Sequence, residues 1–334
     1  MMQEKTSKIK LIKILEILRQ ETDEDHYIDS SELMRRLEEQ GISIERKTLY
    51  TDIELLNQFG YEILCEKTKG FPNKYCIADR LFDVPEVHIL LDAVQSAAFI
   101  TEDKTKVLVD KISSLAGRKR GDILKKNIVE FTTAKSHNER ILYLVSEISQ
   151  AIINRKKIKF NYFDYDANYN KVYRKNSKGE KRGYKVNPLG TVFDNGYYYL
   201  FCFDDFFGQV SHYRIDRMEG VKMTDLDMTP GIEKEIENLP TRKRQLFAMY
   251  GGDTAVVDVV ADKELIDVIY DKFGDRVALH TIDEQWVGFT AEVQVSPTFL
   301  AWCCSFGDKL KVKAPKEVVD QIKEYLDRMV KNYD

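Results

Sequence analysis

The sequence lacks the features of secreted, membrane-spanning and disulfide-stabilised proteins. It contains no stretch of about eighteen apolar residues, and its opening segment MMQEKTSKIK is polar, so we expect neither a membrane-spanning helix nor a signal segment. The five cysteines are odd in number and form no C-x-x-C pair, which predicts neither a disulfide framework nor a zinc site. We therefore expect a cytoplasmic protein with reduced cysteines.

Common catalytic signatures are missing as well. The sequence contains no G-x-x-x-x-G-K-S/T, G-x-G-x-x-G, H-E-x-x-H or G-x-S-x-G motif, which are typical of phosphate loops, dinucleotide sites, zinc proteases and hydrolases. Two carboxylate pairs, Asp164/Asp166 and Asp204/Asp205, lie near an aromatic segment, but their spacing does not predict a shared metal ion. The sequence therefore predicts no catalytic residue, no metal site and no cofactor.

Length and composition predict a soluble protein of several domains. The 334 residues are enough for two or three domains, and 43% of them are hydrophobic and 32% charged. The net charge of −4 would argue against a nucleic-acid partner. Binding depends on local fields, however, so the distribution of charge matters more than its sum.

The first eighty residues predict three helices. Apolar residues recur at helical spacing in residues 9–18, and a second helix is expected from the capping residue Asp29 to the terminator Gly41. A third helix has Ser43 as a candidate N-cap and a stripe made of Leu49, Ile53 and Leu56. Its opposite face is polar.

A hairpin with a basic tip follows these helices, in YEILCEKTKGFPNKYCIAD (residues 61–79). Three helices and a hairpin predict a winged helix-turn-helix domain, whose third helix enters the DNA major groove. The segment RKTLYTDIELL resembles the recognition helix of DeoR-type and WYL-type transcription factors. The candidate DNA-binding residues are Arg46, Lys47, Thr48, Tyr50 and Thr51 on the helix and Lys67, Lys69 and Lys74 in the wing. A small helical domain with a solvated polar face is the alternative.

Residues 81–139 predict a helical connector. Pro85 suits a first helical turn, and Gly117 and Gly121 are expected to break the helical run. The apolar faces of these helices fit either a spacer or a helix pair between protomers. Both interpretations stay open.

Basic and aromatic side chains are interleaved after Asn154. Lysine and arginine far outnumber acidic residues between Arg155 and Lys185. A sheet with both residue types suits single-stranded nucleic acid or a nucleotide, because cations neutralise phosphates and rings stack on bases. The alternative is a small barrel in which the rings pack. The rings belong to Phe160, Tyr162, Phe163, Tyr165, Tyr169, Tyr173 and Tyr184.

The segment NPLGTVFDNGYYYLFCFDDFFGQVSHYRIDRM resembles the core of the WYL domain, with Tyr198-Tyr199-Leu200 at the Trp-Tyr-Leu triplet. The resemblance implies a Sm-like β-barrel that senses a nucleic-acid or nucleotide effector. It carries over Arg214 and Arg217, in YRIDRM, as candidate effector-binding residues, and His212 and Tyr162 join them as candidates. Because side chains alternate along a strand, Arg217 joins Arg214 only if the strand ends near Asp216.

The last hundred residues predict a ferredoxin-like domain with the order β-α-β-β-α-β or a near variant. FLAWCCSFGDKLKVKAPKEVVDQI resembles the WCX extension that follows WYL domains, which implies a role in dimerisation. The neighbouring Cys303 and Cys304 are expected in the core rather than in a redox site.

The whole pattern predicts a multidomain α+β protein that resembles WYL-domain transcriptional regulators. The expected parts are a winged helix-turn-helix domain (1–80), a connector (81–139), a WYL domain (140–230) and a WCX-like domain (231–334). We expect a nucleoid-associated homodimer that binds operator DNA and responds to a ligand, not an enzyme. A nucleic-acid-processing enzyme and a non-transcriptional DNA-binding adaptor remain as alternatives.

Overall fold

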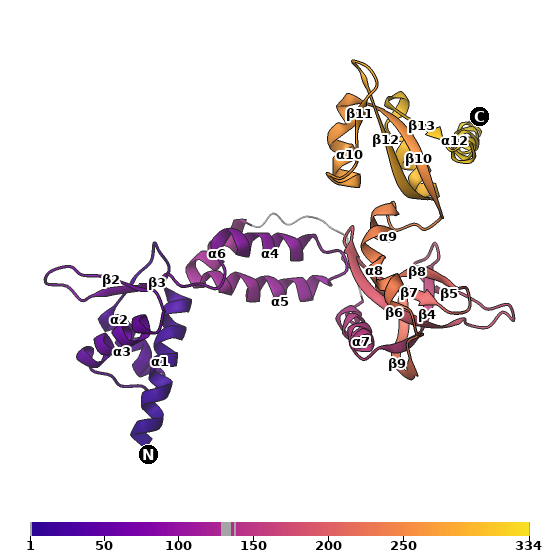
Figure 1. Cartoon of the computed structure of the whole chain (residues 1–334). Helices are drawn as coiled ribbons and strands as arrows, with labels where there is room; N and C mark the ends of the chain where they lie inside the picture. The colour runs from indigo at the N-terminus through magenta and orange to yellow at the C-terminus, as the bar shows by residue number, and fades with distance from the viewer. Residues whose placement is uncertain (1, 128–134, 137, 334) are drawn as a thin grey trace. The chain divides into compact units, whose positions relative to one another are not determined.

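The computed structural model describes residues 2–127, 135–136 and 138–333, and it divides into two compact units, residues 1–139 and 140–334 (Figure 1). Part of the connector expected from the sequence, residues 128–134, lies outside the described residues. Every helix that the structure describes is too short or too polar to serve as a bilayer-spanning segment.

Unit 1 begins with three helices and a wing. Asp29 is confirmed as an N-cap, since its carboxylate accepts hydrogen bonds from the backbone N–H groups of Ser31 and Glu32. The third helix begins at Arg46, three residues after the expected start. Its N-cap is Glu45, whose side chain makes no capping hydrogen bond, so the prediction of Ser43 as the N-cap was wrong. The elements are α1 (Met2–Glu21), β1 (Ile28–Asp29), α2 (Ser30–Glu39), α3 (Arg46–Gln58), β2 (Ile63–Glu66) and β3 (Lys74–Ile77).

The apolar stripe of α3 is confirmed. Leu49, Ile53 and Leu56 are at most 5% exposed and pack in one core with residues of α1, α2 and the wing. A largely buried ion pair, 2.6 Å long, joins Lys10 of α1 to Asp52 of α3. Apolar packing and this charge pair therefore fix α3 against α1, which leaves its other face for contacts outside the domain.

All elements of secondary structure in the described part of the connector are helices. Pro85 is confirmed in the first turn of α4, behind a capping box formed by Asp83 and Glu86. Gly117 ends a 3-10 turn in the left-handed region, as expected. The elements are α4 (Val84–Ser96), α5 (Glu102–Ser113), η1 (Ser114–Ala116) and α6 (Arg118–Asn127).

Gly121 does not break a helix, contrary to the sequence prediction. It lies inside α6, where a Cβ atom would collide with the carbonyl group of Ser113 at the end of α5. Glycine is used here because two helices approach closely, not because the chain turns.

We therefore expect Gly121→Ala to destabilise unit 1 by about 1–3 kcal/mol, since overpacking forces backbone shifts. The measurement is chemical unfolding of the full chain. The matched change Gly183→Ala places its Cβ in open space at an ordinary φ, and we expect it to change the stability by less than about 1 kcal/mol. Equal stability of the Gly121→Ala variant and the parent protein would contradict this account.

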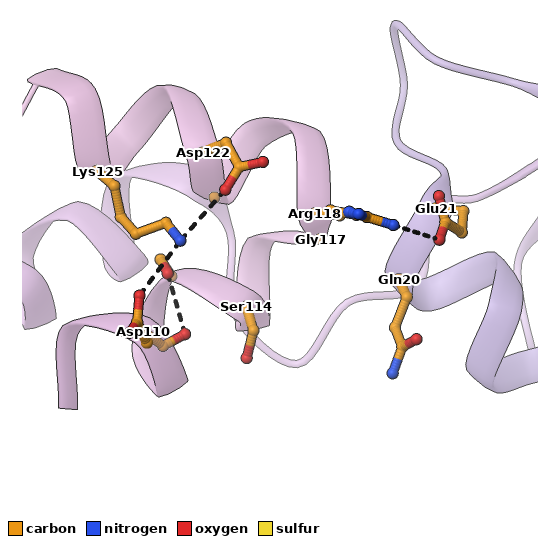
Figure 2. A pocket seen from close by; sticks show the side chains of 10 residues that line it. Gln20, Glu21, Asp110, Ser114, Gly117, Arg118, Asp122 and Lys125 are labelled. Carbon is orange, nitrogen blue, oxygen red and sulfur yellow. Dashed lines mark hydrogen bonds and ion pairs between the residues drawn. The ribbon is translucent and has the colours of Figure 1, made fainter. Parts of the chain in front are cut away.

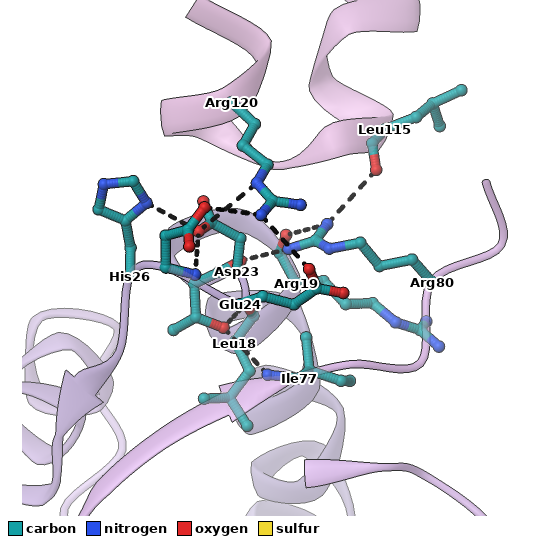
Figure 3. Close-up of polar contacts among 11 residues, drawn as sticks. Leu18, Arg19, Asp23, Glu24, His26, Ile77, Arg80, Leu115 and Arg120 are labelled. Atoms are coloured by element: carbon teal, nitrogen blue, oxygen red, sulfur yellow. Dashed lines mark hydrogen bonds and ion pairs between the residues drawn. The ribbon is translucent and has the colours of Figure 1, made fainter. Parts of the chain in front are cut away.

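Two arginines join the connector to the winged helix (Figure 3). The guanidinium of Arg80 donates hydrogen bonds to the carbonyls of Arg19 (3.1 Å), Leu115 (3.4 Å) and Thr22. Arg120 of α6 donates to a carboxylate oxygen of Asp25 at 2.8 Å. The predicted boundary at residue 80 thus falls within a continuous polar network.

A pocket of about 340 Å³ lies beside this network (Figure 2). Its charged lining is paired internally: Arg118 contacts Glu21 at 3.4 Å, and Lys125 contacts Asp110 and Asp122 at 3.3 and 3.2 Å. Arg118 and Arg120, the two arginines within residues 117–120, therefore both make intramolecular ion pairs. Such paired groups leave no free charge to recruit a ligand.

Unit 2 begins with α7 and a six-stranded antiparallel sheet in the order β5-β4-β6-β7-β8, with β9 also paired to β4. Within the described strands β8 is not paired with β9, so the Sm-like β-barrel expected from the resemblance does not close. The reason is local: the 3-10 turn η2 (Ile215–Arg217) redirects the chain, and β9 then runs along β4. The elements are α7 (Ile141–Ile153), β4 (Lys156–Tyr165), β5 (Lys171–Tyr173), β6 (Gly183–Asp194), β7 (Tyr197–Asp204), β8 (Gln209–Arg214) and β9 (Met218–Asp227).

The C-terminal part of unit 2 has a second antiparallel sheet, in the order β11-β12-β10-β13. Along the chain its main elements follow the expected order β-α-β-β-α-β, and α12 is added at the end. The elements are α8 (Glu233–Glu237), α9 (Leu239–Gln245), β10 (Asp253–Asp262), η3 (Lys263–Leu265), α10 (Ile266–Phe273), β11 (His280–Thr281), β12 (Trp286–Val295), α11 (Pro297–Cys304), η4 (Gly307–Lys309), β13 (Leu310–Ala314) and α12 (Lys316–Val330).

Candidate functional site

Helix α3 carries an exposed polar face. Arg46, Lys47, Thr48 and Thr51 are exposed, as the helical stripe predicts. Tyr50 is only half-buried because its ring packs 6.3 Å from that of Tyr75 in the wing. Four of the five candidates on this helix are thus exposed to a partner, although Arg46 also donates to Ser31 at 3.3 Å, whereas Tyr50 supports the fold.

The wing presents its three candidate lysines, Lys67, Lys69 and Lys74, as exposed side chains. The structure adds Phe71, which is 70% exposed in the turn between β2 and β3 and was not selected from the sequence. The sequence does indicate this exposure, because Phe71 stands between glycine and proline in a turn, where no strand of its own buries the ring. The wing therefore offers positive charge and one aromatic side chain.

In unit 2, the candidate Tyr162 lies inside the sheet rather than on its surface. It is 5% exposed, and burial raises the pKa of its hydroxyl. The hydroxyl oxygen accepts a hydrogen bond from the backbone N–H of Arg214 at 3.3 Å. Tyr162 therefore positions the end of β8, and its phenol offers little surface to a ligand.

The guanidinium of Arg214 is held from two sides. It donates to both carboxylate oxygens of Asp216, at 3.1 and 2.7 Å, and stacks 3.5 Å above the ring of Tyr197. β8 ends at Arg214 and a 3-10 turn follows it. The strand end near Asp216, which was the condition for Arg217 to join Arg214, is therefore confirmed. A ligand at Arg214 would compete with Asp216 for the guanidinium.

Arg217 and Arg174 share one carboxylate. Asp164 accepts from Arg174 at 2.9 Å and from Arg217 at 3.4 Å. Arg174 also lies 4.6 Å above the ring of Tyr162. No local motif singles out Arg174, because its contacts depend on how β4 pairs with the segment after β5.

His212 faces a different space from Arg214 and Arg217. Its Nε2 donates to the carbonyl of Met249, so we infer that Nε2 carries the proton, and burial lowers its pKa. A cleft of about 420 Å³ runs beside it, and the side chains of Arg174 and Arg242 reach this cleft. The buried Nε of Arg242 has no hydrogen-bond partner in the described part of the chain.

The four effector candidates are therefore divided between two neighbouring places. Tyr162, Arg214 and Arg217 surround Asp164 and the end of β8, whereas His212 lines the cleft. Arg174 reaches both. The cleft is lined by Arg174, Phe201, Gln209, Val210, Ser211, His212, Tyr213, Arg242, Leu246, Gly251, Gly252, Asp253 and Gln294.

The aromatic residues of the basic segment divide between packing and exposure. Four of the seven rings are buried: Phe160, Tyr162, Phe163 and Tyr184. Tyr165 and Tyr169 are exposed and stack on each other with centroids 4.2 Å apart. Packing thus explains most of this composition, and a base could stack only at the exposed pair.

The cysteine pair of α11 has the core environment that the sequence predicted. Cys303 is 4% exposed within the C-terminal core, and burial raises its pKa to about 12. The thiolate is the reactive form, so we expect Cys303 to resist alkylation at pH 8 in the folded chain. Mass spectrometry after iodoacetamide treatment measures this, with the exposed Cys65 as an internal control. Equal labelling of both cysteines would contradict it.

Comparisons with known proteins agree with the motifs. A family model described as "WYL domain" matches residues 143–223, and one described as "WCX domain" matches residues 253–330. No curated protein matches the sequence. Among solved structures, the chain is similar to proteasome accessory factor B/C (PafBC) of Arthrobacter aurescens at 15% identity and a TM-score of 0.28, over 94% of this chain and 45% of that one. The chain thus spans less than half the length of that neighbour.

The two matched segments confirm the resemblance that the motifs carry in unit 2. The WYL match includes Tyr198-Tyr199-Leu200 and all four effector candidates, and the WCX match includes the Trp302-Cys303-Cys304 segment. Residues 143–223 of this chain are thus similar to a WYL domain, and residues 253–330 to a WCX domain.

Proposed function

We propose that this protein is a ligand-responsive transcriptional regulator. Unit 1 binds operator duplex DNA as part of a homodimer, and the WYL domain binds a phosphate-bearing effector, either a nucleotide or a short single strand. The observation that carries the proposal is the exposed polar face of α3, with Arg46, Lys47, Thr48 and Thr51, in a chain that also has a WYL domain.

The arrangement of α2, α3 and the wing supports the DNA-binding part. A recognition helix enters the major groove with its exposed N-terminal residues, and in α3 these are Arg46, Lys47 and Thr48. The lysines of the wing are placed on the same domain to contact phosphates. In a homodimer, half-sites are expected about one helical turn apart, or a multiple of it.

The arginines of the WYL domain support the effector part. Arg174, Arg214 and Arg217 are each held by one carboxylate, Asp164 or Asp216. Planar guanidinium groups bind phosphate through two parallel hydrogen bonds, so a phosphate can replace these carboxylates as the partner. An effector then acts only through different affinities for DNA-competent and DNA-incompetent arrangements.

Genome-wide mapping of the full-length protein tests the proposal, with and without DNA damage or exposure to foreign DNA. We expect discrete binding sites whose occupancy changes with the treatment. Uniform recovery of DNA without discrete sites would contradict a role as a transcriptional regulator and would favour the non-transcriptional DNA-binding adaptor. The genes beside this one give a further test, since a regulator often lies next to the operon that it controls.

The contacts of the four carboxylates argue against a nuclease. Asp164 accepts hydrogen bonds from two arginines. Asp166 and Asp204 accept hydrogen bonds from backbone N–H groups of their own turns. Asp205 contacts Lys157 and Thr229. No group of three metal-binding side chains is found among the described residues. We propose that the protein is not an enzyme.

A further inference from the structure

Three lysines form a row across one face of the sheet in the WYL domain. Lys159 of β4 lies directly opposite Lys185 of β6 and Lys222 of β9 in the strand register. Neighbouring strands lie about 4.8 Å apart, so the row extends over about 10 Å. We call these three residues the lysine row.

The lysine row lies on the face away from the aromatic core. Its members are exposed, while Ile158 and Phe160, the neighbours of Lys159 on β4, are 0% and 3% exposed. Side chains alternate between the faces of a strand, so Lys159 points away from those two. The row therefore belongs to a different face from Tyr162, which follows Phe160 by two residues.

The charges of the lysine row are not compensated within the part of the chain that the structure describes. No carboxylate forms an ion pair with any of the three, and none has another polar partner there. Other lysines of the same sheet are paired: Lys157 with Asp205, and both Lys171 and Lys181 with Glu219. Acidic partners are thus used nearby but not at the row.

Like charges at directly opposite positions of neighbouring strands destabilise a sheet. The row contains two such pairs, Lys159 with Lys185 and Lys159 with Lys222. A polyanion bound along the row would remove this repulsion. The arrangement therefore lowers the stability of the free protein and favours a partner with a line of negative charges.

We propose that the lysine row binds the phosphate backbone of duplex DNA without reading its sequence. One strand of a duplex carries a phosphate about every 3.4 Å along the axis, so the row spans about three of them. Lysine binds phosphate as a point charge on a flexible stem, which suits contacts that need no fixed base register. This goes beyond the proposed function, because operator recognition was assigned to unit 1.

The surroundings of the row favour a duplex over a single strand. Proteins that bind single strands combine basic grooves with aromatic rings on which bases stack. The positions two residues along each strand from the row carry no aromatic side chain; they are Lys157, Asn161, Gly183, Asn187, Gly220 and Thr224. These six positions therefore offer no ring on which a base could stack beside the row.

The test compares two full-length triple variants that lose equal charge. The row variant is Lys159→Gln/Lys185→Gln/Lys222→Gln, and the control is Lys313→Gln/Lys316→Gln/Lys331→Gln, which changes three exposed lysines of the WCX domain. Fluorescence anisotropy measures binding to a non-operator duplex over a range of salt concentrations. The row variant should bind about tenfold more weakly at low salt, and its salt slope should fall by about 2.7. The control should match the parent protein.

Thermal unfolding separates this role from a structural one. The row variant should melt at the same temperature as the parent protein or higher, because the repulsion is gone. If the row variant instead melts at a lower temperature, the single variant Lys222→Gln replaces it in the binding experiment. Its salt slope is expected to fall by about 0.9. An unchanged slope, an equal loss in the control, or tighter binding of a single-stranded oligonucleotide through the row would overturn the proposal. Operator preference measured with α3 variants is a separate readout, so either proposal can fail alone.

Discussion

Replacing Arg46 and Lys47 together with alanine should weaken operator binding by about thirtyfold or more. Both side chains are exposed in the first turn of α3, and a base or phosphate contact of this kind contributes about 1–3 kcal/mol. Tyr50 is left intact, because its contact with Tyr75 would make a loss of binding ambiguous. A gel shift with an operator found by genome-wide mapping measures the effect.

The matched control is Lys104→Ala/Lys111→Ala, which removes two exposed cations from α5 of the same unit. It should shift the operator like the parent protein. Thermal unfolding of both double variants should match the parent protein, since neither pair of side chains is buried. An operator shift that survives the α3 substitutions would show that another surface recognises the DNA.

Replacing Arg174 with alanine should lower the affinity for a phosphate-bearing effector by about 10- to 100-fold. A hydrogen bond to a charged group contributes about 1.5–3 kcal/mol, and Arg174 is the cation that reaches both the Asp164 cluster and the cleft beside His212. Titration of a labelled oligonucleotide and of mononucleotides into the full chain measures this. Operator binding without effector should stay close to that of the parent protein.

Three further variants sharpen that experiment. Arg174→Lys should restore little affinity, because lysine cannot form two parallel hydrogen bonds to phosphate. Arg214→Ala should also remove the effector response, whereas Lys178→Ala removes an exposed cation from the turn after β5 and should have no effect. Effector affinity that survives both arginine-to-alanine changes would mean that these side chains only pack the sheet.

Features that depend on local chemistry could be predicted from the sequence. The N-cap Asp29 and the buried stripe of α3 follow from contacts within one helical turn or along one helix face. The same kind of reasoning placed Pro85 in a first turn. The WYL and WCX segments were recognised because their motifs are short and continuous in the chain.

Features that depend on tertiary packing could not be predicted in this way. A glycine at position 121 is typical of a helix end, but it is required there because the helix packs closely against Ser113 of another helix. Arg174 lies in a run of basic residues, and only the fold brings it to Asp164 and Tyr162. The open sheet likewise depends on which edge of β4 the last strand pairs with, and strand composition does not encode that choice.

The contacts of Arg80 determine how this protein can be divided for engineering. A chimaera that exchanges DNA specificity by joining a foreign winged helix at residue 80 would keep Leu115 but lose the native carbonyls of Arg19 and Thr22. The acidic partners of Arg118 and Arg120, which lie at residues 21–25, would be lost with them. The transferable module is therefore the winged helix together with α4, α5 and α6, and a junction after Asn127 keeps the whole network on one side of the cut.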